Sequence, residues 1–142
     1  MHSEKIKTKI LIADDEKDVL TVMVKRVAGE GYEVVAAADG LEAWEKIQSE
    51  SPDVILIDVN MPGMDGFEVL KKVREQPSAK WQPVIIVSAH GEMENIKKGY
   101  SLEADHYITK PCNIEAILSA IKIMVSLIPQ RKPKIELESR SK

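Results

Sequence analysis

The sequence predicts an α/β fold in which five parallel strands alternate with helices. Five short runs with β-type composition lie at residues 9–13, 33–37, 53–57, 83–87 and 106–109, and a stretch with helical periodicity follows each run. The first, third and fourth runs are nearly continuous in apolar residues, which is typical of strands covered on both faces. Alternation with short connections favours a parallel sheet with helices on both sides, a (βα)5 unit.

The helical stretches carry apolar stripes at three-and-four spacing. The stripe of the second helix is Leu41, Trp44 and Ile47, and the strongest stripe belongs to the last helix, at 114–128. The fourth helix offers the fewest apolar contacts and contains Gly99, which costs up to about 1 kcal/mol relative to Ala in a helix interior. We therefore expect the fourth helix to be the most mobile.

Length and composition predict one domain. The chain has 142 residues, 44% of them hydrophobic, which suffices for one core. We expect an N-terminal extension at 1–7, a folded domain at 8–128 and a polar C-terminal tail or linker at 129–142. The single cysteine, Cys112, excludes a disulfide framework. Neither a signal peptide nor a membrane-spanning run is evident, so the sequence predicts a cytoplasmic protein without a membrane partner.

The charge distribution gives no reason to expect nucleic-acid binding by the domain. The formal net charge is -3, and the last fourteen residues hold five basic and two acidic side chains. The rest of the chain therefore carries -6, which would repel a phosphate backbone.

Polar side chains follow four of the five predicted strands. Asp14 and Asp15 follow the first, Asp58 the third, Ser88 the fourth and Lys110 the fifth. In open parallel sheets, ligands bind beyond the carboxyl ends of the strands. The strand order 2-1-3-4-5 would bring all of these side chains together.

Each of these residues also has a simpler local interpretation. An aspartate pair after a strand often caps a helix, and for Asp14 and Asp15 alone capping is the better interpretation. Asp58 could open an Asx-turn, Ser88 could be a local cap, and Lys110 could be an ordinary surface lysine. Four unrelated local explanations at four strand ends are much less probable together than one shared site.

Four segments together resemble the receiver domain of two-component response regulators, in particular chemotaxis regulators. They are "ADDE" after the first strand, "DVNMPGMDG" after the third, "VSAH" after the fourth and "YITKP" after the fifth. The resemblance spans about residues 8 to 128. It implies a flavodoxin-like fold with strand order 2-1-3-4-5.

The resemblance implies that Asp58 is the phosphoacceptor and that a divalent cation lies beside it. Asp15 and Asp58 would bind Mg2+ or Mn2+ directly, Asp14 mainly through water, and the backbone carbonyl of Asn60 would complete the protein ligands. Clustered carboxylates call for a cation, because like charges about 4 Å apart repel by roughly 4 kcal/mol at an effective dielectric near 20. Mg2+ suits such oxygen ligands.

The other site residues follow from the same resemblance. Ser88 and Lys110 would stabilise the transferred phosphoryl group, and Ser88 and Tyr107 would form the switch. With or without that role, Tyr107 is expected to be a half-buried strand aromatic. Asn60 and His90 occupy positions that tune the lifetime of the aspartyl phosphate. A cis peptide bond before Pro111 would aim Lys110 into the site.

The implied function is a phosphorylation-controlled signalling switch rather than an enzyme with turnover. The phosphodonor would be a sensor histidine kinase or a histidine phosphotransfer protein, and the output a downstream protein target or a fused output domain. The fourth helix, fifth strand and fifth helix would form the output surface and a phosphorylation-dependent homodimer.

Two alternatives remain open from the sequence. A magnesium-dependent phosphohydrolase of the haloacid-dehalogenase type would also form an aspartyl phosphate, but its nucleophile follows the first strand and a second Asp comes two residues later. This chain has adjacent aspartates, Asp14 and Asp15, after the first strand, and Asn60 two residues after Asp58, so the phosphohydrolase interpretation fits poorly. The chain could also be the receiver of a larger regulator, such as a transcription factor or nucleotide cyclase. Fourteen residues after the last helix are too few for such an output domain, so either the protein ends here and signals by docking or the sequence is part of a longer one.

Overall fold

The computed structural model describes residues 7–77 and 80–128 and contains the five strands and five helices expected in alternation. The strands are β1 (Lys9–Ala13), β2 (Glu33–Ala37), β3 (Val54–Ile57), β4 (Val84–Ser88) and β5 (His106–Thr109). The helices are α1 (Lys17–Ala28), α2 (Gly40–Glu50), α3 (Gly66–Glu75), α4 (Met93–Ser101) and α5 (Ile114–Leu127). The predicted strands are therefore confirmed to within one residue. The predicted N-terminal extension up to Ile6 and the C-terminal tail lie outside the described residues.

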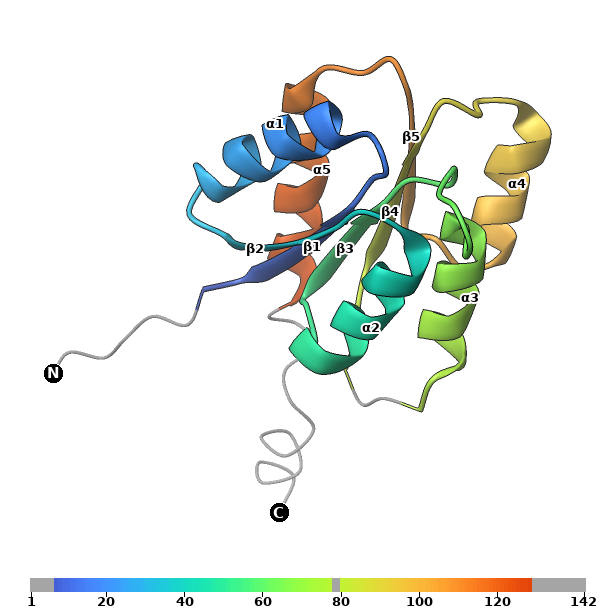
Figure 1. The fold of residues 1–142 in the computed structure, drawn as a ribbon, viewed down its shortest axis with the longest axis horizontal. Coiled ribbons are helices and arrows are strands. Elements are labelled where there is room, and N and C mark those ends of the chain that lie inside the picture. Colours follow the sequence, from blue (N-terminus) through green and yellow to red (C-terminus); the bar gives the residue numbers. More distant parts are fainter. Residues whose placement is uncertain (1–6, 78–79, 129–142) are drawn as a thin grey trace, which may run out of the picture.

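The sheet is parallel throughout, in the order β2-β1-β3-β4-β5. Helices α1 and α5 cover one face, and α2, α3 and α4 cover the other (Figure 1). The predicted flavodoxin-like fold is confirmed. The register aligns Ala13 with Ile57 and Ser88 with Thr109, so the strands end at one edge. Residues that follow β1, β3 and β5 consequently emerge close together.

Two apolar cores, one on each face, hold the helices against the sheet. Because side chains alternate along a strand, neighbouring residues of β1 serve different cores: Leu11 packs with α2 and α3, and Ile10 and Ile12 pack with α1 and α5. All three side chains are fully buried. The interpretation of the apolar runs as strands covered on both faces is therefore correct.

The predicted core stripe of α2 is wrong for one residue. Leu41 is 56% exposed, and the buried face of the helix runs through Gly40, Ala43 and Ile47 instead. The reason is the close approach of α2 to the loop before α3: a Cβ on Gly40 would lie 1.7 Å from the Met64 carbonyl oxygen. This contact turns the small residue inward and leaves Leu41 in solvent.

Helix α4, like α1, begins without a side-chain capping bond from its N-cap residue, which is Glu92 in α4. Two of its apolar residues, Met93 and Tyr100, are 65% and 46% exposed. Gly99 is buried against the sheet. Weak anchoring agrees with the expected mobility of α4, which stays a prediction.

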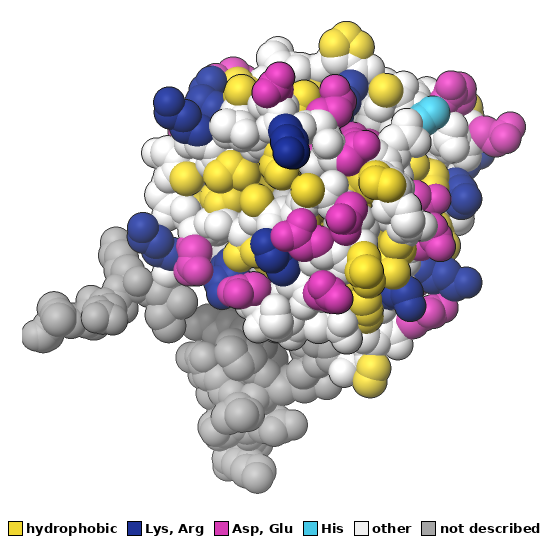
Figure 2. All heavy atoms as spheres, viewed as in Figure 1, with side chains coloured by type: hydrophobic (Ala, Val, Ile, Leu, Met, Phe, Trp, Pro, Cys, Tyr) yellow, Lys and Arg dark blue, Asp and Glu magenta, His cyan; other side chains and the backbone are white. Residues whose placement is uncertain are grey.

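The surface carries charges of both signs. On the face drawn in Figure 2, Lys and Arg side chains are scattered among Asp and Glu side chains. Interspersed charges give no extended field of one sign on that face. Within the described residues, no helix combines the length and the hydropathy required to cross a membrane.

Candidate phosphorylation site at the carboxyl edge of the sheet

A single ammonium group joins the ends of three strands. Lys110, which follows β5, donates from Nζ to Oδ2 of Asp14 at 2.9 Å and to Oδ2 of Asp58 at 3.0 Å. The two aspartates follow β1 and β3 and are 1% and 6% exposed, while the Lys110 side chain is 19% exposed. The fold therefore assembles the predicted carboxylates and lysine in one partly buried site.

The second carboxylate oxygen of each aspartate accepts a hydrogen bond from the backbone of the loop that follows it. Oδ1 of Asp14 accepts from the backbone N–H of Glu16 at 2.9 Å, and Oδ1 of Asp58 accepts from the N–H of Asn60 at 3.0 Å. These are Asx-type contacts to the residue two positions on. The local interpretation of Asp58 is thus correct as well, and the local turn orients the side chain for the shared site. Helix α1 begins at Lys17, and its N-cap residue is Glu16, which makes no side-chain capping bond, so neither aspartate occupies the N-cap position.

Gly66 allows the loop after Asp58 to fold back tightly. Its N–H donates to the Val59 carbonyl at 2.9 Å, and a Cβ on Gly66 would lie only 2.4 Å from the carbonyl oxygen of Asp58. The start of α3 can pack onto the backbone of Asp58 because position 66 has no side chain. Asp65 then caps α3 through a capping box with Glu68.

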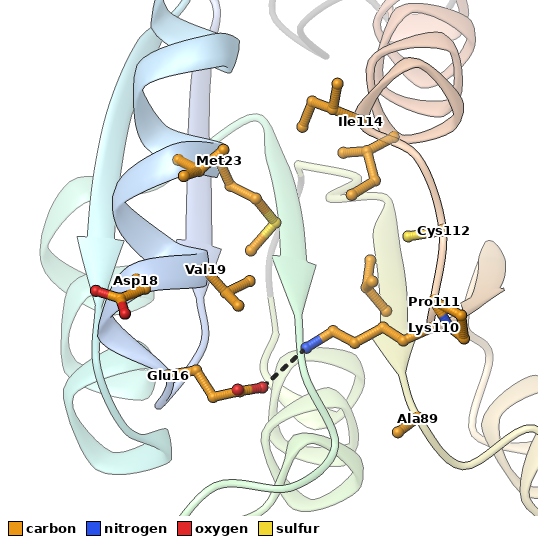
Figure 3. Close-up of a pocket in the computed structure, with 12 residues that line it drawn as sticks. Glu16, Asp18, Val19, Met23, Ala89, Lys110, Pro111, Cys112 and Ile114 are labelled. Carbon is orange, nitrogen blue, oxygen red and sulfur yellow. Dashed lines mark ion pairs between the residues drawn. The ribbon is translucent and has the colours of Figure 1, made fainter.

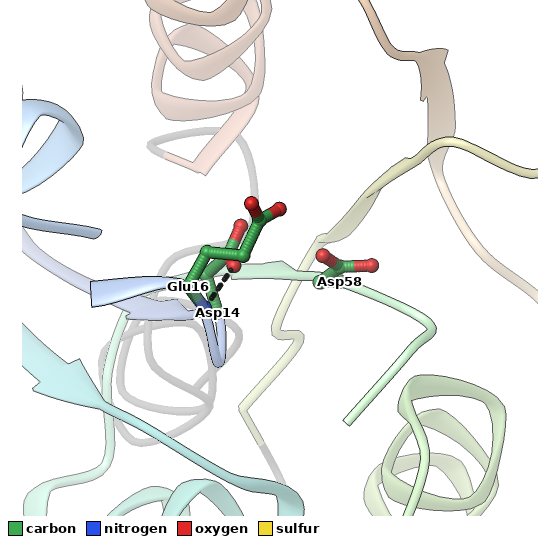
Figure 4. A group of neighbouring side chains, drawn as sticks. All are labelled: Asp14, Glu16 and Asp58. Carbon is green, nitrogen blue, oxygen red and sulfur yellow. Dashed lines mark hydrogen bonds between the residues drawn. The ribbon is translucent and has the colours of Figure 1, made fainter. Parts of the chain in front are cut away.

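Three carboxylates offer oxygen atoms that lie within 4.8 Å of one another: Asp14, Glu16 and Asp58 (Figure 4). Three oxygen donors around an incomplete shell are the set that Mg2+ accepts, since it retains several waters. The donor set therefore fits the expected cation. Asp15 is exposed and is absent from this group, whereas Glu16, which our sequence reasoning had not considered as a ligand, belongs to it. The acidic run "DDE" contained that signal.

Burial controls the protonation chemistry of the site. It raises the pKa of Asp58 above its usual value, although the hydrogen bond and the charge of Lys110 oppose this effect. Burial lowers the pKa of Lys110, but its bonds to Asp14 and Asp58 outweigh that effect and the pKa lies above its ordinary value. The lysine is therefore a permanent cation at the site.

His90 connects the two predicted switch residues with the loop that follows Asp58. The backbone N–H of His90 donates to Oγ of Ser88 at 3.1 Å, and the Tyr107 hydroxyl donates to the backbone carbonyl oxygen of His90. Its ring nitrogen Nε2 lies 2.6 Å from the Asn60 side-chain nitrogen. Ser88 is fully buried and Tyr107 is 9% exposed. Side chains from β4, β5 and two loops are thereby linked beside Asp58.

The backbone of Lys110, directly after β5, is held by a hydrogen bond to β4. The Lys110 backbone N–H donates to the Ser88 carbonyl at 2.7 Å. The Lys110–Pro111 peptide bond is cis, which is the isomer that the resemblance implies. Ser88 is the last residue of β4 rather than the first residue beyond it, because its backbone pairs with Thr109.

Comparison with known proteins agrees with this architecture. Residues 10–122 match the sequence model of the response regulator receiver domain. The chain belongs to that family, whose members are signalling switches of two-component systems that work with kinases and output domains.

Similar proteins include regulators that are longer than this chain. PhoP of Bacillus subtilis, the alkaline phosphatase synthesis transcriptional regulatory protein, is 34% identical over 131 residues, which cover 92% of this chain and 54% of PhoP. The uncharacterized transcriptional regulatory protein YesN of the same organism is 38% identical over 122 residues, 83% of this chain and 32% of YesN. The chain thus spans about half of the first relative and a third of the second.

A solved structure gives the same fold. The CheY-like receiver domain protein of Methanospirillum hungatei JF-1 superposes with a TM-score of 0.83 at 31% identity, covering 89% of this chain and all of that one. The strand order and the covering of both faces are therefore those of a CheY-like receiver.

Proposed function

We propose that the chain is a phosphorylation-controlled switch in which Asp58 accepts a phosphoryl group from a phosphohistidine on a sensor histidine kinase or a phosphotransfer protein. The observation that carries this proposal is the ammonium of Lys110 held at 3.0 Å from Asp58 Oδ2. Phosphoryl transfer requires positioned charge to neutralise the equatorial oxygens, and Lys110 provides a positive charge beside the proposed nucleophile.

The neighbouring residues have complementary roles in this proposal. Asp58 attacks phosphorus and becomes an aspartyl phosphate. Lys110 neutralises one phosphoryl oxygen, and the hydroxyl of Ser88 donates to another after leaving its contact with the His90 N–H. Tyr107 stays inward behind Ser88 in the phosphorylated form, and the contact between Asn60 and His90 influences how long the phosphoryl group persists.

A divalent cation, Mg2+ or Mn2+, would supply charge neutralisation at the same oxygens. The residues proposed to hold it are Asp14, Asp15, Asp58 and the backbone carbonyl of Asn60. The carboxylate of Glu16 is an additional candidate because it lies within 4.8 Å of the Asp14 and Asp58 oxygens. Acidic side chains after β1 thus serve the cation, whereas Lys110 serves the phosphoryl group.

Intact-mass measurement tests the proposal. With Mg2+ and acetyl phosphate, the wild-type chain should gain one phosphoryl group, and Asp58→Asn should gain none. Asp53→Asn is a matched control, because Asp53 lies at the opposite end of β3 and bonds to the backbone N–H of Lys9. Equal labelling of wild type and Asp58→Asn would remove Asp58 as the acceptor.

The proposed output surface is formed by α4, β5 and α5, acting on a protein target, on a fused output domain or in a homodimer. Exposed apolar side chains on these helices support it, namely Tyr100 on α4 and Ile123 and Leu127 on α5. Light scattering before and after phosphorylation tests the homodimer, which should appear only with the phosphorylated chain. A turnover assay on small phosphate esters tests the alternative phosphohydrolase function.

A further inference from the structure

An open cavity of about 680 Å³ lies beside the proposed phosphorylation site, between α1 and the segment that joins β5 to α5. Its floor consists of the buried side chains of Met23, Val87 and Ile117. Val22 of α1 stands at the cavity with 56% of its surface exposed. A cavity of this size is sufficient for a small organic molecule.

The cavity is continuous with the site through two side chains. Lys110 and Glu16 line it, and Figure 3 shows them reaching toward each other across one end, with Nζ and Oε1 3.8 Å apart. Lys110 is also the group that contacts Asp58. Asp18 lines the cavity from α1, but in Figure 3 its carboxylate points away from Lys110. One end of the cavity therefore holds the Lys110 ammonium, paired with Glu16 and Asp58, and apart from Asp18 the remainder is apolar.

This polarity matches an acyl phosphate with an aliphatic chain. Such a donor has an anionic phosphoryl group, which complements Lys110, and an apolar tail, which the aliphatic floor can remove from water. The uncharged lining side chains are aliphatic, sulphur-containing or proline. These side chains can make apolar contacts with a hydrocarbon chain. A polar leaving group would find few hydrogen-bond partners among them.

We propose that this cavity binds the aliphatic chain of a small acyl phosphate, so that Asp58 is phosphorylated directly by donors of the butyryl phosphate class in preference to acetyl phosphate. The inference rests on the proposed function of Asp58. In the reaction a carboxylate oxygen of Asp58 bonds to phosphorus, and the bond between phosphorus and the acyl oxygen breaks. The acyl group leaves as a carboxylate anion, so charge balances without proton transfer or a further reactant.

The test compares the rates at which butyryl phosphate and acetyl phosphate label Asp58, measured by intact mass with Mg2+. The two leaving groups are both simple aliphatic carboxylates, so the chain length is the main variable. Each methylene fully transferred from water to an apolar site favours binding by about fourfold, so two methylenes give up to about a 15-fold preference. We expect the rate constant at low donor concentration to favour butyryl phosphate by about five- to 15-fold.

Variants locate the preference in the cavity. Val22→Gln should reduce the butyryl preference severalfold and leave acetyl phosphate labelling unchanged. Leu41→Gln is the matched control, because Leu41 is also 56% exposed but belongs to α2 and does not line the cavity. It should retain the full preference.

Chemical modification gives an independent readout, since Cys112 is the only cysteine of the chain and lines the cavity. Benzyl methanethiosulfonate attaches a ring to its sulphur and should abolish the butyryl preference, whereas methyl methanethiosulfonate should largely preserve it. Cys112→Ala should be insensitive to both reagents.

The outcomes separate this inference from the proposed function. Equal rates for the two donors, or a preference that persists in Val22→Gln and after benzyl modification, would overturn the inference while Asp58 labelling by acetyl phosphate stands. In that case a protein partner would be the better candidate for binding at the cavity. Absence of Asp58 labelling by either donor would overturn both.

Discussion

Gly99 of α4 lies directly against the ring of Tyr107. A Cβ added to Gly99 would stand 3.0 Å from Cδ2 of that ring and 3.2 Å from Cδ1 of Ile86. The tyrosine is 9% exposed, and its hydroxyl donates to the His90 carbonyl. The glycine therefore creates the space in which the proposed switch side chain lies inward beneath α4.

The effect of Gly99→Ala on stability should depend on the ring of Tyr107. In the Tyr107→Ala background, the substitution should stabilise the chain by up to about 1 kcal/mol through helix propensity. In the wild type, the crowded ring should cancel that gain or reverse it, since overpacking typically costs about 1–3 kcal/mol. Urea unfolding of the four chains in a double-mutant cycle measures the coupling. An identical effect in both backgrounds would contradict the proposed contact.

The fold was predictable because its signals are short-range and repeated. The run 54–57 is apolar at every position and buried throughout, so its continuous apolar composition indicated a strand covered on both faces. The strand order came from the family resemblance, because hydrophobic patterning does not specify which parallel strands are neighbours. Leu41 was misassigned because a stripe of large residues outweighed Gly40, whose inward position depends on a backbone contact with Met64.

The candidate site was predictable only as a set of residue types at strand ends. The sequence indicated that Asp14, Asp58 and Lys110 converge, and register and strand order place them within hydrogen-bond distance. The sequence could not indicate which acidic side chain after Asp14 lies near Asp58 and could bind the cation. The backbone conformation of the loop after β1 decides whether that side chain is Asp15 or Glu16. The role of His90 in joining Ser88 and Tyr107 was also hidden, since it is carried by backbone groups.

Gly66→Ala should destabilise the chain strongly, because its Cβ would meet the Asp58 carbonyl oxygen at 2.4 Å and backbone atoms cannot move aside locally. We expect a loss of about 3 kcal/mol or more, at the upper end of overpacking costs. Gly29→Ala is the matched control, because its Cβ would lie 3.3 Å from the nearest atom, and it should change stability little. Urea unfolding at pH 7 compares the two. Similar small losses for both would show that α3 does not pack on the backbone of Asp58 as described.

Asp58→Asn should stabilise the metal-free chain at neutral pH. Burial raises the folded pKa of Asp58 above the ordinary value of 3.8, so its favourable contribution exists at low pH and is lost as pH rises through the raised pKa. At pH 7 the buried charge is a net cost, which the neutral amide removes. The melting temperature in EDTA should therefore be higher for Asp58→Asn at pH 7, with the difference fading below about pH 4. Asp105→Asn should instead lower it, because Asp105 pairs with Arg74 at 2.7 Å. A lower melting temperature for Asp58→Asn at pH 7 would contradict the assignment.

Two neighbouring variants distinguish the proposed ligands of the cation. Asp15→Asn should nearly abolish the stabilisation that Mg2+ gives the wild type, whereas Glu16→Gln should weaken it less. Glu16 is 65% exposed at its side chain and already lies near the Lys110 ammonium, and ordering its longer side chain costs more rotamer freedom. Asp15 has the shorter side chain and follows Asp14 directly in the loop after β1.

The measurement is the melting temperature of each variant in EDTA and in excess Mg2+. For a dissociation constant on the order of 1 mM, about 10 mM Mg2+ adds about 1.4 kcal/mol to the wild type by mass action. Removing one negative charge from a site that already holds Asp14 and Asp58 should also raise the melting temperature in EDTA, because like charges in the cluster repel. A full Mg2+ response in Asp15→Asn together with none in Glu16→Gln would transfer the ligand role to Glu16, the carboxylate that lies nearer in this structure. An unchanged wild-type melting temperature would remove the cation from the proposal, since a ligand that binds only the folded chain must stabilise it.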